Sequence, residues 1–126
     1  MSHTKKIDQK PVDHVFSCPI GGTLEIIAGR WKPDIIWSLQ QGPVRFNQLK
    51  RAVGSVSQKM LTQQLRELIR DGLVTRTQYA EIPPRVEYDQ TALAKSLAPV
   101  FEALIGWSDK HGPAVQKARA KYDKAI

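Results

Sequence analysis

The segment 57–72 constrains the fold of this 126-residue chain more than any other part of it. Leu61, Leu65 and Leu68 are spaced four and three residues apart, which places them on one face of a helix. Ser57 suits the N-cap of that helix, and the Asp-Gly pair at its other end suits its termination. The segment therefore predicts an amphipathic helix with one buried leucine stripe.

Further elements are predicted on both sides of this helix. Apolar spacing before it predicts helices over residues 23–27, 35–39 and 46–53, with Pro19 and Pro33 suited to first-turn positions. After it, segments rich in Val, Thr and Tyr flank a proline pair, which predicts a hairpin of strands 74–79 and 85–88 with a rigid tip. Thr91 suits the cap of one last long helix, with Pro99 as its kink.

This order of elements is that of a winged helix-turn-helix, a mostly α fold with a two-stranded β-hairpin. We expect additional helices at both ends to serve dimerisation. The predicted divisions are an N-terminal arm over residues 1–17, a winged helix-turn-helix domain over 18–112, and a basic tail over 113–126.

The composition narrows the classes of protein and partner. Nineteen Lys and Arg against twelve Asp and Glu give a net charge of +7, which favours a polyanionic partner. No run approaches the roughly 20 apolar residues of a membrane span, and the first residues hold no secretory signal. The single cysteine, Cys18, excludes an internal disulfide and a multi-cysteine metal site. We expect a cytoplasmic protein with no membrane partner, no metal and no cofactor.

The helix predicted to begin at Ser57 carries, on its exposed faces, residue types that can contact DNA: Gln58, Lys59, Thr62, Gln63 and Arg66. Glutamine can pair with adenine edges, arginine with guanine and lysine with phosphate. On an isolated helix such a face would be ordinary solvated surface. Here a short helix precedes it, a hairpin follows it, and residues 45–76 carry seven basic and two acidic side chains, a net charge of +5. We therefore predict DNA contacts from Ser57 and the five residues above, and further contacts from Arg45, Lys50, Arg76 and Arg85.

A series of ordered motifs runs along the chain: Cys18-Pro19-Ile20, IIAGRWKP over 26–33, RFNQL over 45–49, SQKMLTQQLREL over 57–68, DGLV over 71–74 and PPRVEY over 83–88. With these motifs the chain resembles the HxlR-type regulators, relatives of the MarR group, over roughly residues 18–107. The resemblance implies a homodimer on palindromic operator DNA that represses or activates transcription and has no enzymatic activity.

A palindromic operator needs two recognition helices, so we expect a dimer interface. The candidate interface residues extend the apolar faces of the first and last helices: Ile20, Leu24, Leu104, Ile105 and Trp107. Each of them can instead complete the core of one protomer.

Cys18 is the candidate sensor of an oxidant or electrophile, and we expect a small-molecule or oxidant effector among the partners. If Pro19 is the first helical residue, Cys18 is the N-cap, where unpaired N–H groups and the helix dipole stabilise a thiolate. The family resemblance supports this role, because some members sense through a cysteine near this point. A buried, inert cysteine is the alternative.

Two other functional classes compete with a DNA reader. A winged helix can serve as a protein-interaction module without DNA binding, and such a module would carry an acidic or apolar recognition face. An enzyme is disfavoured because the sequence holds no nucleophile elbow and no phosphate-binding glycine loop. His3, His14 and His111 also lack metal-ligand spacing.

Overall fold

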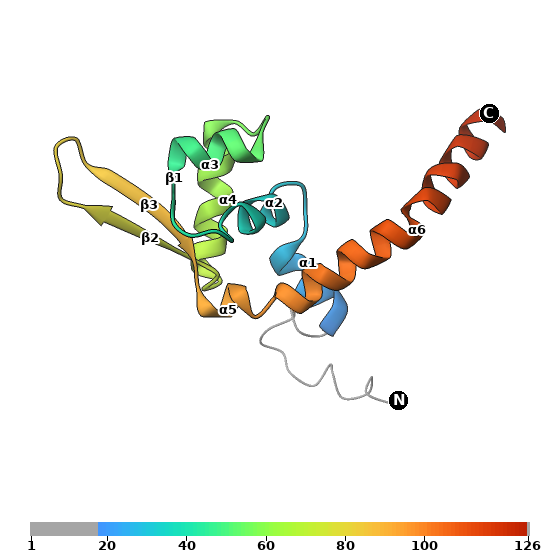
Figure 1. Ribbon diagram of the computed structural model, residues 1–126, viewed down its shortest axis with the longest axis horizontal. Coiled ribbons are helices and arrows are strands. Elements are labelled where there is room, and N and C mark those ends of the chain that lie inside the picture. Colours follow the sequence, from blue (N-terminus) through green and yellow to red (C-terminus); the bar gives the residue numbers. More distant parts are fainter. Residues whose placement is uncertain (1–17, 126) are drawn as a thin grey trace. The chain divides into compact units, whose positions relative to one another are not determined.

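A computed structural model describes residues 18–125 of the chain (Figure 1). Its elements, in chain order, are α1 (Pro19–Ile27), α2 (Lys32–Ser38), β1 (Val44–Arg45), α3 (Phe46–Val53), α4 (Gln58–Arg70), β2 (Val74–Tyr79), β3 (Arg85–Gln90), α5 (Ala92–Lys95) and α6 (Ala98–Ala125). The chain divides after Ala94 into two compact units, 1–94 and 95–126. Each is described by itself below, and the predicted arm over 1–17 lies outside the described residues.

The core of the first unit forms between α2, α3, α4 and β2. Its largest fully buried side chains are Ile35, Ile36, Leu39, Leu49, Leu61, Leu65, Leu68 and Val74. The predicted leucine stripe of α4 is therefore confirmed. Burial of a leucine or isoleucine side chain contributes about 1.5–3 kcal/mol, so this stripe fixes which face of α4 points inward.

The N-terminal ends of the first two helices follow from their prolines. Pro19 and Pro33 both lie in the first turn, as predicted, because a missing N–H costs nothing there. The two helices start earlier than the apolar spacing indicated, at Pro19 and Lys32. The ends of α4 are as predicted: the Ser57 hydroxyl accepts a hydrogen bond from the Met60 N–H at 3.0 Å, and Gly72 follows with a φ of 78°.

The sheet has three strands in the order β1-β3-β2, and not the two that the sequence predicted. β2 pairs with β3 from Val74 opposite Gln90 to Tyr79 opposite Arg85. The additional strand β1 places Val44 opposite Tyr88. A two-residue strand has no alternation that a sequence can display, and its partner lies more than 40 residues away along the chain.

The predicted last helix is two helices, which corrects the expectation of one helix kinked at Pro99. α5 ends at Lys95, and Pro99 lies in the first turn of α6, where proline is tolerated. α6 then runs through Pro113 to Ala125, so the predicted boundary between residues 112 and 113 falls inside a helix. The residues after Pro113 are mostly strong helix formers, which offsets the hydrogen bond that one proline removes. The division into domain and tail stays a prediction.

Within residues 18–125 no helix is both long enough and apolar enough to cross a membrane. In the same part of the chain, no group of three or more His, Cys, Asp or Glu side chains is arranged to hold a metal ion.

Candidate nucleic-acid interface

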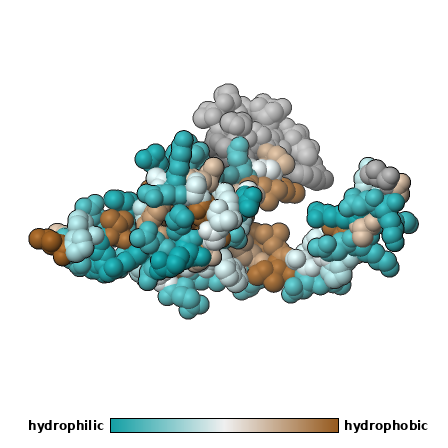
Figure 2. Space-filling model, turned by 90° about the horizontal axis from the view of Figure 1, so that it is seen from above, coloured by the Kyte–Doolittle hydropathy of each residue, from teal (hydrophilic) through white to brown (hydrophobic). Residues whose placement is uncertain are grey.

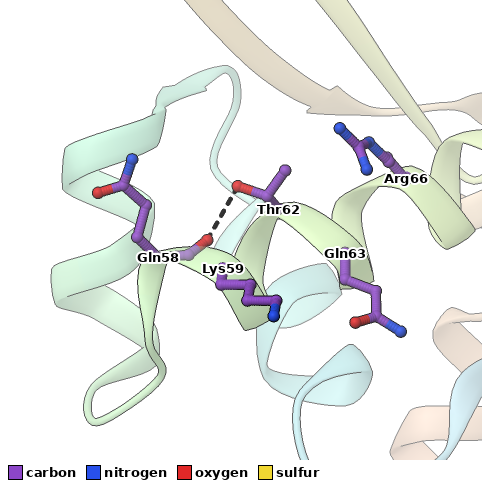
Figure 3. A pocket seen from close by; sticks show the side chains of 5 residues that line it. All are labelled: Gln58, Lys59, Thr62, Gln63 and Arg66. Carbon is purple, nitrogen blue, oxygen red and sulfur yellow. Dashed lines mark hydrogen bonds between the residues drawn. The ribbon is translucent and has the colours of Figure 1, made fainter.

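One open hollow of about 530 Å³ lies along the N-terminal part of α4. It is lined by side chains of that helix alone: Gln58, Lys59, Thr62, Gln63 and Arg66 (Figure 3). We call these five residues the recognition surface. They are the same five that the sequence predicted on the exposed faces of this helix, and they lie on the sides of α4 that its buried leucines leave free. The Thr62 hydroxyl donates to the Gln58 carbonyl at 2.9 Å, so its methyl group remains outward.

The charge around the recognition surface is positive. Between residues 45 and 70 the chain carries six basic side chains and one acidic side chain, Glu67, a net charge of +5. The first turn of α4 contains no acidic residue. A polyanion can therefore approach the N-terminal end of α4 without repulsion from a carboxylate in that turn.

Glu67 forms an ion pair with Lys32 of α2, a residue that the sequence did not point to. The Lys32 Nζ lies 2.6 Å from the Glu67 Oε1, and the Lys32 side chain is only 11% exposed. The hydrogen bond from Lys32 lowers the pKa of Glu67 below 4.5, against the opposing effect of partial burial. On its other oxygen, Glu67 accepts a hydrogen bond from the Gln63 Nε2 at 3.4 Å. No sequence pattern links residues 35 positions apart, so this pair could be found only in the folded chain.

A second hollow, of about 480 Å³, lies between the start of α3 and the hairpin of β2 and β3, which we call the wing. Its lining residues are Arg45, Phe46, Asn47, Gln48, Arg51, Pro84, Arg85 and Val86. The Arg45 backbone N–H donates to the Gln48 Oε1 at 3.3 Å and so closes the first turn of α3. Arg45 is exposed at this hollow, whereas the predicted contact Lys50 is half-buried and lines neither hollow.

The predicted wing contact Arg85 already has partners within the wing. Its two terminal nitrogens each lie 2.9 Å from a carboxylate oxygen, one of Glu81 and one of Glu87. Its guanidinium also stacks on the Tyr79 ring at 3.9 Å. Burial alone would lower the pKa of Arg85, but the two carboxylates outweigh it and raise the pKa above its ordinary value. Arg85 therefore holds the two strands of the wing together.

The rest of the wing is not basic. Residues 74–90 carry two basic and three acidic side chains, a net charge of −1. Arg76 is exposed on β2 and, among the described residues, enters no ion pair. Ile82 at the tip is fully exposed, and Figure 2 shows apolar surface at that end of the molecule. Within residues 45–90 the net positive charge therefore lies in the segment 45–70 and not on the wing.

Cys18 is the N-cap of α1, as predicted, and it is exposed. Its Sγ accepts a hydrogen bond from the Gly21 N–H at 3.4 Å. The five predicted interface residues are also exposed, with Ile20 74%, Leu24 46%, Leu104 51%, Ile105 43% and Trp107 58% accessible.

Residues 26–116 of the chain match the family described as HxlR-like helix-turn-helix. The chain belongs to this family. YdeP of Bacillus subtilis strain 168, named as an HTH-type transcriptional regulator, is 39% identical over 108 residues, which cover 86% of this chain and 84% of YdeP.

Solved structures of similar regulators agree with this assignment. The redox regulator HypR in its reduced form superimposes with a TM-score of 0.74 at 36% identity, covering 79% of this chain and 98% of HypR. The reduced form of the regulator YodB from B. subtilis gives a TM-score of 0.68 at 33% identity, covering 74% of this chain and 92% of YodB. This HxlR-like protein is a DNA-binding transcriptional regulator with a winged helix-turn-helix fold. YdeP and YodB are named as transcriptional regulators, and HypR is named as a redox regulator.

Proposed function

We propose that two copies of this HxlR-like regulator bind one palindromic operator and thereby repress or activate transcription in the cytoplasm. In each copy the N-terminal part of α4 enters the major groove. The observation that carries the proposal is the recognition surface, five polar or basic side chains on one exposed side of a helix whose other side is anchored in the core. We also propose that the protein acts without catalysis.

Within the groove, each side chain has a contact that its chemistry suits. Gln58 and Gln63 offer an oxygen and an N–H to adenine, and Arg66 offers two N–H groups to guanine. Thr62 presents its methyl group to a thymine methyl, since its hydroxyl is bonded to the helix backbone. Ser57, Lys59, Arg45 and Lys50 bind phosphates.

The wing contributes through Arg76, which reaches a phosphate or the minor groove. Arg85 supports this contact by stiffening the wing, because its terminal nitrogens are bonded to Glu81 and Glu87. We assign it no phosphate of its own while both of those ion pairs persist.

The proposed dimer buries the exposed apolar side chains of α1 and α6 against a second copy. Leu104, Ile105 and Trp107 are each more than two-fifths exposed, and apolar aromatic side chains are typical anchors of protein interfaces. Two copies present two recognition helices, which an operator with inverted half-sites requires.

Selection of bound duplexes from a random library tests the operator and the dimer together. We expect enriched sequences to contain two inverted half-sites with centres about 10 base pairs apart, or a multiple of that spacing. Sedimentation of the complex should give two protein chains for each duplex. Enrichment of a single unrepeated half-site bound by one chain would contradict the proposal. Enrichment of no sequence, with binding that ignores sequence, would contradict the palindromic operator, and absence of any binding to the duplexes would favour the protein-interaction module instead.

Cys18 is the proposed sensor of an oxidant effector, a role that its exposed N-cap position supports and that relatives named as redox regulators make relevant. An oxidant such as diamide would take two electrons and two protons from two thiols. Because the sequence has one cysteine, the disulfide would join two chains or join Cys18 to a small thiol. Cys18→Ser should abolish any effect of diamide on DNA binding, and an effect of equal size in wild type and Cys18→Ser would contradict the sensor role.

A further inference from the structure

Lys32 is the only buried charged residue in the part of the chain that the structure describes. It lies at the first position of α2, and its ammonium group contacts the Glu67 Oε1 of α4 at 2.6 Å. Burial of an unpaired ammonium group is costly, so the folded chain holds Glu67 in the one position where it neutralises Lys32. Glu67 is thus fixed from the core side, although its own side chain is 38% exposed.

The second carboxylate oxygen of Glu67 faces the recognition surface. It accepts a hydrogen bond from the Gln63 Nε2 at 3.4 Å, one helical turn back along α4. Gln63 extends away from the α4 backbone in Figure 3, so its amide group lies where a ligand of the recognition surface would meet it.

A glutamine amide has two faces that differ in chemistry. Its oxygen accepts hydrogen bonds, its nitrogen donates two, and a rotation of 180° about the last side-chain bond exchanges them. The carboxylate of Glu67 can only accept, so it selects the rotamer with nitrogen toward Glu67. One N–H of the Gln63 amide is bonded to Glu67. The amide oxygen and the second N–H remain available to a ligand of the recognition surface. An oxygen beside an N–H is the pattern that matches N6 and N7 of adenine.

We propose that Glu67, held by Lys32, is a positioning residue for base recognition: it fixes the amide of Gln63 in the orientation that reads adenine, although neither Glu67 nor Lys32 touches DNA. The inference rests on the proposed function, in which Gln63 faces a base. A free amide would also have to lose its rotamer freedom on binding, whereas the amide held by Glu67 is already ordered.

The test measures base discrimination at single positions of the enriched operator. Duplexes that carry each single base-pair change are titrated by fluorescence anisotropy, and the ratio of their Kd to that of the parent duplex is recorded. Gln63→Ala first identifies the base pair that Gln63 reads, which is the position where a base-pair change no longer weakens binding. A bidentate pair discriminates by about 5-fold to 150-fold, and we expect Glu67→Gln to bring the ratio at that pair within about 3-fold of the Gln63→Ala value.

Three features separate positioning from a general structural effect. Ratios at the other base pairs should stay at their wild-type values in Glu67→Gln. In a protein that already carries Gln63→Ala, Glu67→Gln should cause no further change in the ratio. Glu25→Gln, which removes an exposed carboxylate of α1, serves as the matched control and should leave every ratio unchanged.

Wild-type discrimination by Glu67→Gln at the Gln63 base pair would overturn the inference, and so would an equal loss at every base pair. If Glu67→Gln fails to fold, the double variant Lys32→Met with Glu67→Gln removes both charges, keeps the buried lysine stem as an apolar side chain, and must show the same selective loss. If Gln63→Ala changes no ratio, the inference fails while sequence-specific binding by other residues stands. If the wild-type protein enriches no sequence, the proposed function itself fails.

Discussion

Removal of one cation from each end of α4 gives the sharpest test of which part of this helix meets DNA. Lys59 is the second residue of α4 and belongs to the recognition surface, whereas Arg70 is the last residue of α4 and is outside it. Both are exposed, and the Arg70 side chain is 83% accessible beside Asp71. Lys59→Gln and Arg70→Gln therefore remove the same charge from the same helix at opposite ends, and the net charge of the two variants is equal.

The expected magnitude follows from counterion release. Each phosphate contact contributes about −0.9 to the slope of log K against log salt, so the loss of Lys59 from both copies of a dimer should make the slope about 1.8 less steep. A fourfold change from about 50 to about 200 mM salt then weakens the variant about 12-fold less than it weakens the wild-type protein. Arg70→Gln should keep the wild-type slope.

Fluorescence anisotropy with the enriched operator, over a series of salt concentrations, measures these slopes. Circular dichroism checks that both variants are folded. Equal slopes for Lys59→Gln and wild type would refute the placement of this end of α4 on phosphates. A slope change of the same size in both variants would show that the basic charge acts at long range and not through a defined contact.

The remaining predictions concern the dimer, the ion pair and the wing. Trp107→Asp should weaken self-association at least about tenfold in analytical ultracentrifugation, while Trp37→Asp, at another exposed tryptophan, should not; equal effects would contradict the proposed interface. Because the folded protein lowers the pKa of Glu67, its stabilising effect should be complete above about pH 5 and should fade as the pH falls through 4.5 and below. The difference in unfolding free energy between wild type and Glu67→Gln, from urea titrations, should therefore shrink in acid, and a difference that is constant with pH would contradict the ion pair. Arg85→Gln should increase proteolysis at the wing, because the ion pair with Glu81 and the stacking on the Tyr79 ring are both lost. The same variant should leave the slope of log K against log salt unchanged. A slope that becomes less steep, as in Lys59→Gln, would mean that Arg85 leaves its partners for DNA.

Elements whose signals lie within one short segment could be predicted from the amino-acid sequence alone. The leucine spacing, the Ser57 cap and the glycine after Asp71 all lie within one helix, so the extent and the inward face of α4 were predicted correctly. The recognition surface follows from the same facts, because the sides opposite a buried stripe must be exposed.

The tertiary structure decided the features that depend on residues far apart in sequence. β1 exists only because β3 pairs with it, and the Lys32–Glu67 contact exists only because α2 packs near α4.

Arg85 is the residue for which the sequence and the folded sheet indicate different contacts. Its type and its position in the hairpin favoured a phosphate contact. The register of β2 and β3 instead places it opposite Tyr79, with Glu87 two residues along the same face of β3. A charge on a strand is free or neutralised according to its cross-strand and same-face neighbours, and these are set by register, which only the folded sheet defines.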